Sequence, residues 1–164
     1  MDMNKKLMGK TFAILGDSYS TFCGWIPEGN EVYYPKPEMV ADVLSVEQTW
    51  WHQLMTKYNC TLLINSSYSG SPVSYTGYKT DSNPTGDERK TAFITRMKSD
   101  LAASKVQPEV ILILGGTNDH YAPAPSGEIR YEGWTEEDLR CFFPAFAYML
   151  DYLCKQHPAA RVIN

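Results

Sequence analysis

Three short apolar segments divide the chain, and segments with helical periodicity lie between them. The apolar segments are Phe12–Leu15, Thr61–Ile64 and Val110–Leu114. Continuous apolar runs of this length are typical of strands that are covered on both faces, as in a parallel sheet. The pattern therefore predicts a three-layer α/β fold with a mostly parallel sheet between helices. Arg161–Asn164 opens another apolar run and predicts the start of a fourth strand.

The first two helices follow from capping and periodicity. Ser45–Gln48 matches a capping box, and apolar residues at helical spacing then extend to about Tyr58. A second helix is predicted over residues 87–104, because acidic residues open it and an apolar stripe runs along it. The stripe consists of Phe93, Met97 and Leu101.

The third helix should begin after Thr135, where three acidic residues fill its first turn. Pro144 falls inside the helical pattern, so we expect it to kink the helix or to split it in two. One face of this helix should be buried against the sheet. The residues predicted for that face are Leu139, Phe143, Phe146, Leu150 and Leu153.

Composition indicates one globular domain over residues 1–164, since 43% of the chain is hydrophobic and 21% is charged. The net charge is −4 and no basic run occurs, which argues against a nucleic-acid partner. No apolar stretch approaches the length of a membrane span. The polar N-terminus has no signal-peptide core, so we expect a cytoplasmic protein.

The four cysteines have no metal-binding spacing, and no cluster of His, Asp and Glu has it either. We therefore expect reduced cysteines, no metal and no cofactor. The cysteines are Cys23, Cys60, Cys141 and Cys154.

Residues with polar or catalytic side chains, or glycines, follow each of the three predicted strands. The first strand ends in Gly16-Asp17-Ser18, the loop after the second contains Gly70, and the third ends in a Gly-Gly-Thr-Asn-Asp segment over residues 115–119. In open α/β sheets, ligands bind outside the carboxyl ends of the strands. A serine, a backbone donor beside a glycine and a side-chain amide at one edge are suited to acyl transfer with a stabilised oxyanion.

In these three segments and their order, the chain resembles the SGNH hydrolases, also called GDSL-type esterases and lipases. The resemblance implies a flavodoxin-like fold and hydrolysis of small carboxylic esters. It implies that Ser18 is the nucleophile, and that Gly70 and Asn118 belong to the oxyanion hole. Asp17 and Asp119 would support the site structurally.

The chain departs from this family in one respect. The family has an Asp-x-x-His motif near the C-terminus, which supplies the general base, and this sequence contains none. The simplest expectation is a chain truncated after the start of the fourth strand. His120 directly follows the third segment and is the candidate replacement base, although a solvated loop histidine is the alternative.

Three functions therefore remain open from the sequence. The first is a serine ester hydrolase acting on small esters, with acyl or acetyl groups on carbohydrate as candidate substrates. The second is a weakly active or inactive remnant, or a binding module, because serine without a base is a poor nucleophile. The third is a flavodoxin-like flavin-binding module, in which Ser18, Ser20 and Thr21 would hold a phosphate. An incomplete fourth strand would leave an open sheet edge, so a homodimer through that edge is also predicted.

Overall fold

The computed structural model describes residues 7–36 and 43–164, and its centre is a four-stranded sheet. All strand pairs are parallel, and the order across the sheet is β2-β1-β3-β4. This confirms the predicted α/β fold with a parallel sheet. The strands are β1 (Thr11–Gly16), β2 (Thr61–Ser67), β3 (Val110–Leu114) and β4 (Arg161–Ile163).

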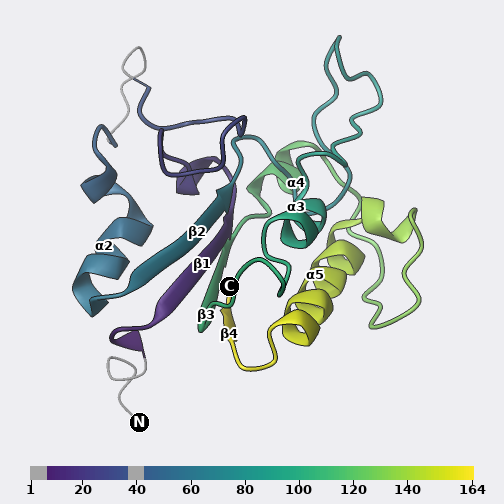
Figure 1. The fold of residues 1–164 in the computed structure, drawn as a ribbon. Helices are drawn as coiled ribbons and strands as arrows, with labels where there is room; N and C mark the ends of the chain where they lie inside the picture. The colour runs from purple at the N-terminus through teal and green to yellow at the C-terminus, as the bar shows by residue number, and fades with distance from the viewer. Residues whose placement is uncertain (1–6, 37–42) are drawn as a thin grey trace.

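Helices cover both faces of the sheet (Figure 1). One face is covered by α2, and the other by α3 and α5, which pack against each other. The helices are α2 (Trp50–Tyr58), α3 (Phe93–Ser99), α4 (Thr117–Tyr121) and α5 (Phe142–Gln156). Single 3-10 turns form η1 (Ser18–Ser20), η2 (Val46–Gln48) and η3 (Asp138–Arg140).

The side chains of β1 alternate between two hydrophobic cores. Phe12 and Ile14 point toward α2, where Trp51 closes the first core. Ala13 and Leu15 point the other way and contribute to the second core with α3 and α5. Because both faces of the strand are buried, neither face needs a polar residue, which explains the continuous apolar run in the sequence.

The first predicted helix is divided by Thr49. The capping box of Ser45 and Gln48 is present, but it closes the 3-10 turn η2. The Thr49 hydroxyl then accepts a hydrogen bond from the backbone N–H of His52 and caps α2. The helix ends at Tyr58, as predicted, because Asn59 adopts a left-handed conformation with φ of 51°.

The second predicted helix is shorter than residues 87–104, since α3 covers only Phe93–Ser99. Asp87 and Glu88, which were expected in its first turn, instead make loop contacts with Arg89 and Thr91. Asp87 also accepts a hydrogen bond from Arg140, which lies 53 positions away, so a tertiary contact holds this segment outside the helix. The predicted stripe is correct, and all three of its members are fully buried: Phe93, Met97 and Leu101.

The third predicted helix is interrupted at Cys141, between η3 and α5. Pro144 lies in the first turn of α5, where a backbone N–H would have no helical acceptor. The predicted helix is thus split in two, one of the two expected outcomes, and α5 continues through the proline.

The predicted buried face of this third segment was also only partly right. Leu139 and Leu153 are buried, but Phe143 is 43% exposed. The face of α5 that meets the core contains Ala145, Met149 and Leu153. These residues recur every four positions and so lie on one face of the helix. Phe143 and Phe146 were predicted to be buried because their side chains are large and apolar.

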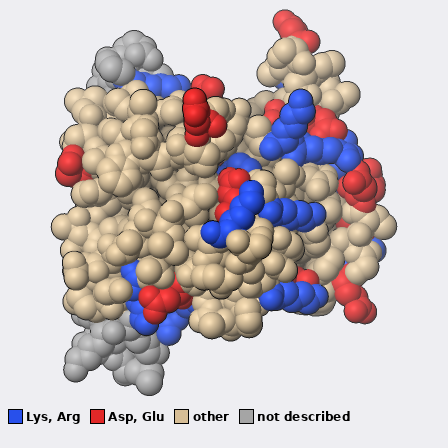
Figure 2. Space-filling view, in the orientation of Figure 1, with Lys and Arg blue, Asp and Glu red and all other residues tan. Residues whose placement is uncertain are grey.

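The surface differs between the two sides of the sheet. Figure 2 shows Lys and Arg interleaved with Asp and Glu on the side that carries α3 and α5, and few charges over α2 and β2. Within the described residues, no helix combines the length and apolarity that crossing a membrane requires. The homodimer through an open sheet edge remains a prediction.

The corrected face of α5 can be tested by truncation. We expect Met149→Ala to lower the free energy of unfolding by about 2–5 kcal/mol, because it leaves a cavity in the core. Phe143→Ala should cost about 1 kcal/mol or less, since its ring is largely exposed. Urea denaturation of both variants measures this, and equal losses would contradict the assigned face.

Candidate active site

The end of β1 is shaped for a tight turn. A side chain at Gly16 would place its Cβ 2.5 Å from the Ser20 Cβ and 2.6 Å from the Ser67 hydroxyl, so only glycine fits. Asp17 follows and caps the 3-10 turn η1, because its carboxylate accepts the backbone N–H of Tyr19 at 3.1 Å. Asp17 is buried, and this burial raises its pKa. The turn presents Ser18 at the carboxyl edge of the sheet.

Ser18 is half-buried, and its polar groups are only partly used. Its carbonyl accepts hydrogen bonds from the N–H and the hydroxyl of Thr21. Across the described residues, neither the Ser18 hydroxyl nor its backbone N–H donates to a protein group. The residue predicted as nucleophile thus has a hydroxyl and an amide available for a ligand.

Gly70 lies in the loop after β2, in a left-handed conformation with φ of 81°. A Cβ at this position would meet nothing within 4 Å, so the backbone is open to its surroundings. In the part of the chain that the structure describes, the Gly70 N–H donates to no acceptor, whereas the next residue, Ser71, donates to the carbonyl of Tyr68.

The end of β3 carries a pair of glycines and the short helix α4. A Cβ at Gly115 would lie 2.3 Å from the ring of Phe93, and Gly116 has φ of 104°. Asn118 and Asp119 on α4 are both buried. The glycine pair therefore lets the chain turn sharply and bring these two polar residues back toward the loop after β2.

Asp119 fixes α4 to that loop. Its carboxylate accepts the backbone N–H groups of Val73 at 2.7 Å and Ser74 at 2.9 Å. Burial raises the pKa of Asp119, and these two hydrogen bonds act in the opposite direction. Asp119 therefore accepts hydrogen bonds from two backbone N–H groups of the loop. The adjacent Asn118 binds different groups.

Both ends of the Asn118 amide are engaged. Its Nδ2 donates to the carbonyl of Ser71 at 3.0 Å, and its Oδ1 accepts the hydroxyl of Tyr78 at 3.0 Å. An amide nitrogen carries two hydrogens, so one N–H of Asn118 remains available. The sequence interpretation did not single out Tyr78 as a partner of Asn118.

A buried arginine joins the strand ends to one another. Arg96 on α3 is 4% exposed and donates to the carbonyls of Gly16, Ser66 and Thr91 and to the hydroxyl of Ser71. Burial lowers the pKa of Arg96 to about 9. The sequence interpretation missed this residue, because a single arginine beside an apolar helical stripe is normally exposed.

These contacts connect the three predicted segments. Arg96 links Gly16 to Ser71, and Ser71 in turn accepts the Asn118 amide. The segments that carry Ser18, Gly70 and Asn118 are thus joined through two hydrogen-bonded neighbours.

His120 lies at the same edge but is not joined to this network. It is exposed, and its ring contacts Tyr121 edge-on with centroids 5.3 Å apart. Among the described residues it makes no hydrogen bond to Ser18. His120 lines a hollow of about 470 Å³ together with Gly116, Asp119 and Phe142.

The other two histidines lie elsewhere. His52 contacts the rings of Trp25 and Trp51, and His157 is buried with its Nε2 2.6 Å from the carbonyl of Leu101. No three His, Cys, Asp or Glu side chains within residues 7–36 and 43–164 are grouped so that they could hold a metal ion.

Comparison with known proteins decides the family. A family profile described as GDSL-like lipase/acylhydrolase matches residues 10–164. The chain belongs to this family. Its members are carboxylic ester hydrolases, and this assignment confirms the resemblance inferred from the three sequence segments. No curated protein matches the chain.

Solved structures agree with the assignment. A GDSL-like lipase from Bacteroides uniformis superposes with a TM-score of 0.85 at 43% identity, covering 95% of this chain and 70% of that one. A GDSL-like lipase from Bacteroides ovatus gives a TM-score of 0.84 at 42% identity, with 94% and 70% coverage. A family two carbohydrate esterase from Clostridium thermocellum, solved with cellohexaose, shares the fold at 16% identity, with a TM-score of 0.56 and coverage of 94% and 42%.

The role of Arg96 in holding the strand ends can be measured by unfolding. We expect Arg96→Met to lower the free energy of unfolding by about 3 kcal/mol or more, because it leaves buried carbonyls without a donor. The control is Arg130→Met, which removes an arginine whose side chain is 47% exposed and should change stability little. Similar urea midpoints for the two variants would contradict this role.

Proposed function

We propose that this GDSL-family chain cleaves carboxylic esters through Ser18, with an oxyanion hole formed by the N–H groups of Ser18 and Gly70 and by the Asn118 amide. One observation carries the proposal. Each of these three groups has a hydrogen that no protein acceptor takes within the described residues. Partly buried donors without acceptors are costly in a folded protein, so their presence together favours a functional site.

In the proposed reaction, the Ser18 hydroxyl oxygen attacks the ester carbonyl and forms a tetrahedral intermediate. The negative oxygen of this intermediate accepts the three N–H groups, and each such donor contributes about 3–4 kcal/mol to the stability of the transition state. The alcohol then leaves with a proton, and the acyl group stays on Ser18. Water attacks the acyl-enzyme and releases the carboxylic acid, which restores the serine hydroxyl.

The proton of Ser18 requires a base, and His120 is the candidate within this chain. Its ring makes no hydrogen bond to Ser18 in the described structure, so base catalysis by His120 would require the ring to move. This same observation favours the second candidate function, a weakly active or binding-only protein that retains the oxyanion hole. Turnover of nitrophenyl acetate above the buffer rate separates the two functions.

We further propose small acyl esters, including acyl groups on carbohydrate, as the substrate class. Exposed aromatic side chains near the strand ends support this, since flat rings stack well on sugars. Tyr19 is 50% exposed and Tyr121 is 69% exposed. The carbohydrate esterase with a related fold adds support only at the level of architecture.

Covalent labelling tests the nucleophile independently of the natural substrate. We expect a fluorophosphonate probe to label the chain at Ser18, because the phosphoryl oxygen can occupy the oxyanion hole while fluoride leaves. Ser18→Ala should abolish labelling, and Ser104→Ala, at an exposed turn, should retain it. Mass spectrometry of the labelled peptide identifies the site, and a folded parent chain that stays unlabelled would refute the proposal.

A further inference from the structure

The loop between β2 and α3 contains an arm that projects from the body of the protein, visible as the teal loop at the top of Figure 1. Thr76 and Asp87 pair as an isolated antiparallel bridge at its base. The N–H of Gly77 donates to the carbonyl of Gly86 at 2.8 Å, which brings the two sides of the arm together. We refer to residues 76–87 as the arm.

The two sides of the arm approach so closely that glycine is required on both. A Cβ at Gly77 would lie 2.0 Å from the Glu88 side chain, and a Cβ at Gly86 would lie 2.6 Å from the Gly77 carbonyl oxygen. Tyr78 follows directly after this close approach at the base of the arm.

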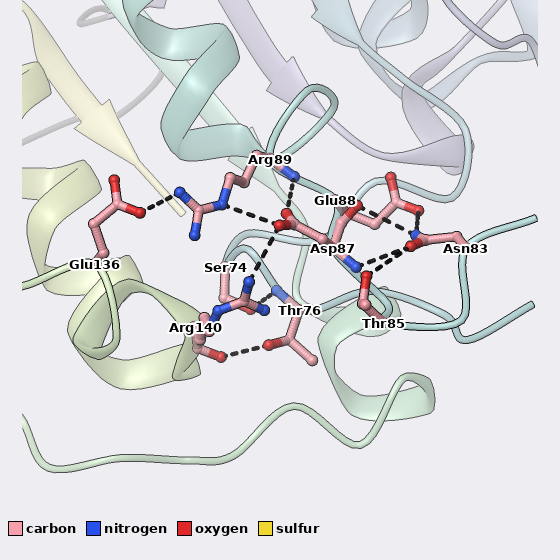
Figure 3. A network of polar contacts seen from close by, with 9 residues as sticks. All are labelled: Ser74, Thr76, Asn83, Thr85, Asp87, Glu88, Arg89, Glu136 and Arg140. Atoms are coloured by element: carbon pink, nitrogen blue, oxygen red, sulfur yellow. Dashed lines mark hydrogen bonds and ion pairs between the residues drawn. The ribbon is translucent and has the colours of Figure 1, made fainter.

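Charged residues attach the base of the arm to the segment before α5 (Figure 3). The Asp87 carboxylate accepts hydrogen bonds from Arg89 and from Arg140, each at 3.1 Å. Arg89 also pairs with Glu136, and the Thr76 hydroxyl donates to the Arg140 carbonyl at 2.8 Å. The arm is therefore held from both sides at its base.

Tyr78 on the arm donates a hydrogen bond from its hydroxyl to Asn118 Oδ1, at 3.0 Å. Since Asn118 Nδ2 already donates to the Ser71 carbonyl, the amide group is held at its oxygen and at one of its hydrogens. The direction of the remaining N–H is then fixed by the plane of the amide. A donor to the amide oxygen also polarises the group, which strengthens the N–H as a donor.

We propose that Tyr78 is a positioning residue for the oxyanion hole, and that it aligns and polarises the Asn118 amide through its hydroxyl. This inference rests on the proposed function of Asn118, and it assigns the arm a role in the chemistry of Ser18. Tyr78 itself need not touch the substrate. Burial, together with Tyr121 and the carboxylates of Asp17 and Asp119, raises the pKa of Tyr78, so its hydroxyl keeps the proton that it donates.

Tyr78→Phe removes only the hydroxyl and is the variant of choice. The matched control is Tyr131→Phe, which removes the same atom from a side chain that is 80% exposed. The first readout is the pair of side-chain amide signals of Asn118 in a ¹⁵N–¹H spectrum, assigned by their absence in Asn118→Ala. We expect Tyr78→Phe to shift these signals and to speed their exchange with water, and Tyr131→Phe to leave them unchanged.

The second readout is the rate of fluorophosphonate labelling at Ser18. Loss of the hydroxyl should slow labelling about tenfold, the scale of one hydrogen bond to the oxyanion hole. In the Asn118→Ala background, Tyr78→Phe should cause no further slowing, because its effect passes through the amide. Equal slowing in both backgrounds would show that Tyr78 acts by another route and would overturn the inference.

The two readouts separate this inference from the proposed function. Unchanged Asn118 signals in Tyr78→Phe overturn the positioning role, whatever the labelling rate. A parent chain that never labels at Ser18 refutes the proposed nucleophile, while shifted Asn118 signals still support the contact between arm and amide.

Discussion

The carboxyl edge of this sheet depends on one buried guanidinium. The carbonyl groups of Gly16 in β1 and Ser66 in β2 belong to buried residues near the strand ends. Arg96 supplies donors to Gly16 and Ser66 and also to the loop hydroxyl of Ser71. Burying a charged group is costly unless its hydrogen bonds are satisfied. The hydrogen bonds that offset this cost also join the ends of β1 and β2 to the loop that follows β2.

The site is then built outward from this fixed base. Glycines at the ends of β1 and β3 allow turns that any side chain would block, and each turn is followed by a carboxylate that accepts backbone N–H groups. Asp17 and Asp119 therefore stabilise the turns on either side of the edge. Among the residues that the structure describes, the N–H groups of Ser18 and Gly70 and one N–H of Asn118 are left without a protein acceptor.

The sequence predicted the strands, their parallel arrangement and the family, because those features depend on contiguous residues. Phe12–Leu15 is apolar throughout because both faces of β1 are buried, and the segment Gly16-Asp17-Ser18 follows at a fixed spacing. Helix boundaries were less accurate. Residues near Asp87 left the helical pattern because their charges bind partners more than 45 positions away in the chain.

The same reason explains the residues that were missed. Nothing local distinguishes Arg96 from a solvent-exposed arginine, and nothing local marks Tyr78 among eleven tyrosines. Their significance lies in contacts that close only when loops from different strands meet. The apolar face of α5 shows a related error, since side-chain size suggested Phe143 while the helix geometry buries Met149.

The ion pair between Arg89 and Glu136, at the base of the arm, is exposed to the salt in solution. The Glu136 side chain is 71% exposed and that of Arg89 is 42% exposed, so this pair meets the surrounding electrolyte directly. The screening length in water shortens from about 10 Å at 0.1 M ionic strength to about 3 Å at 1 M. We therefore expect dissolved salt to weaken this ion pair, and with it one of the contacts that hold the base of the arm. Because Tyr78 lies on the same arm and donates to Asn118, ionic strength is a condition to control in any measurement on this contact.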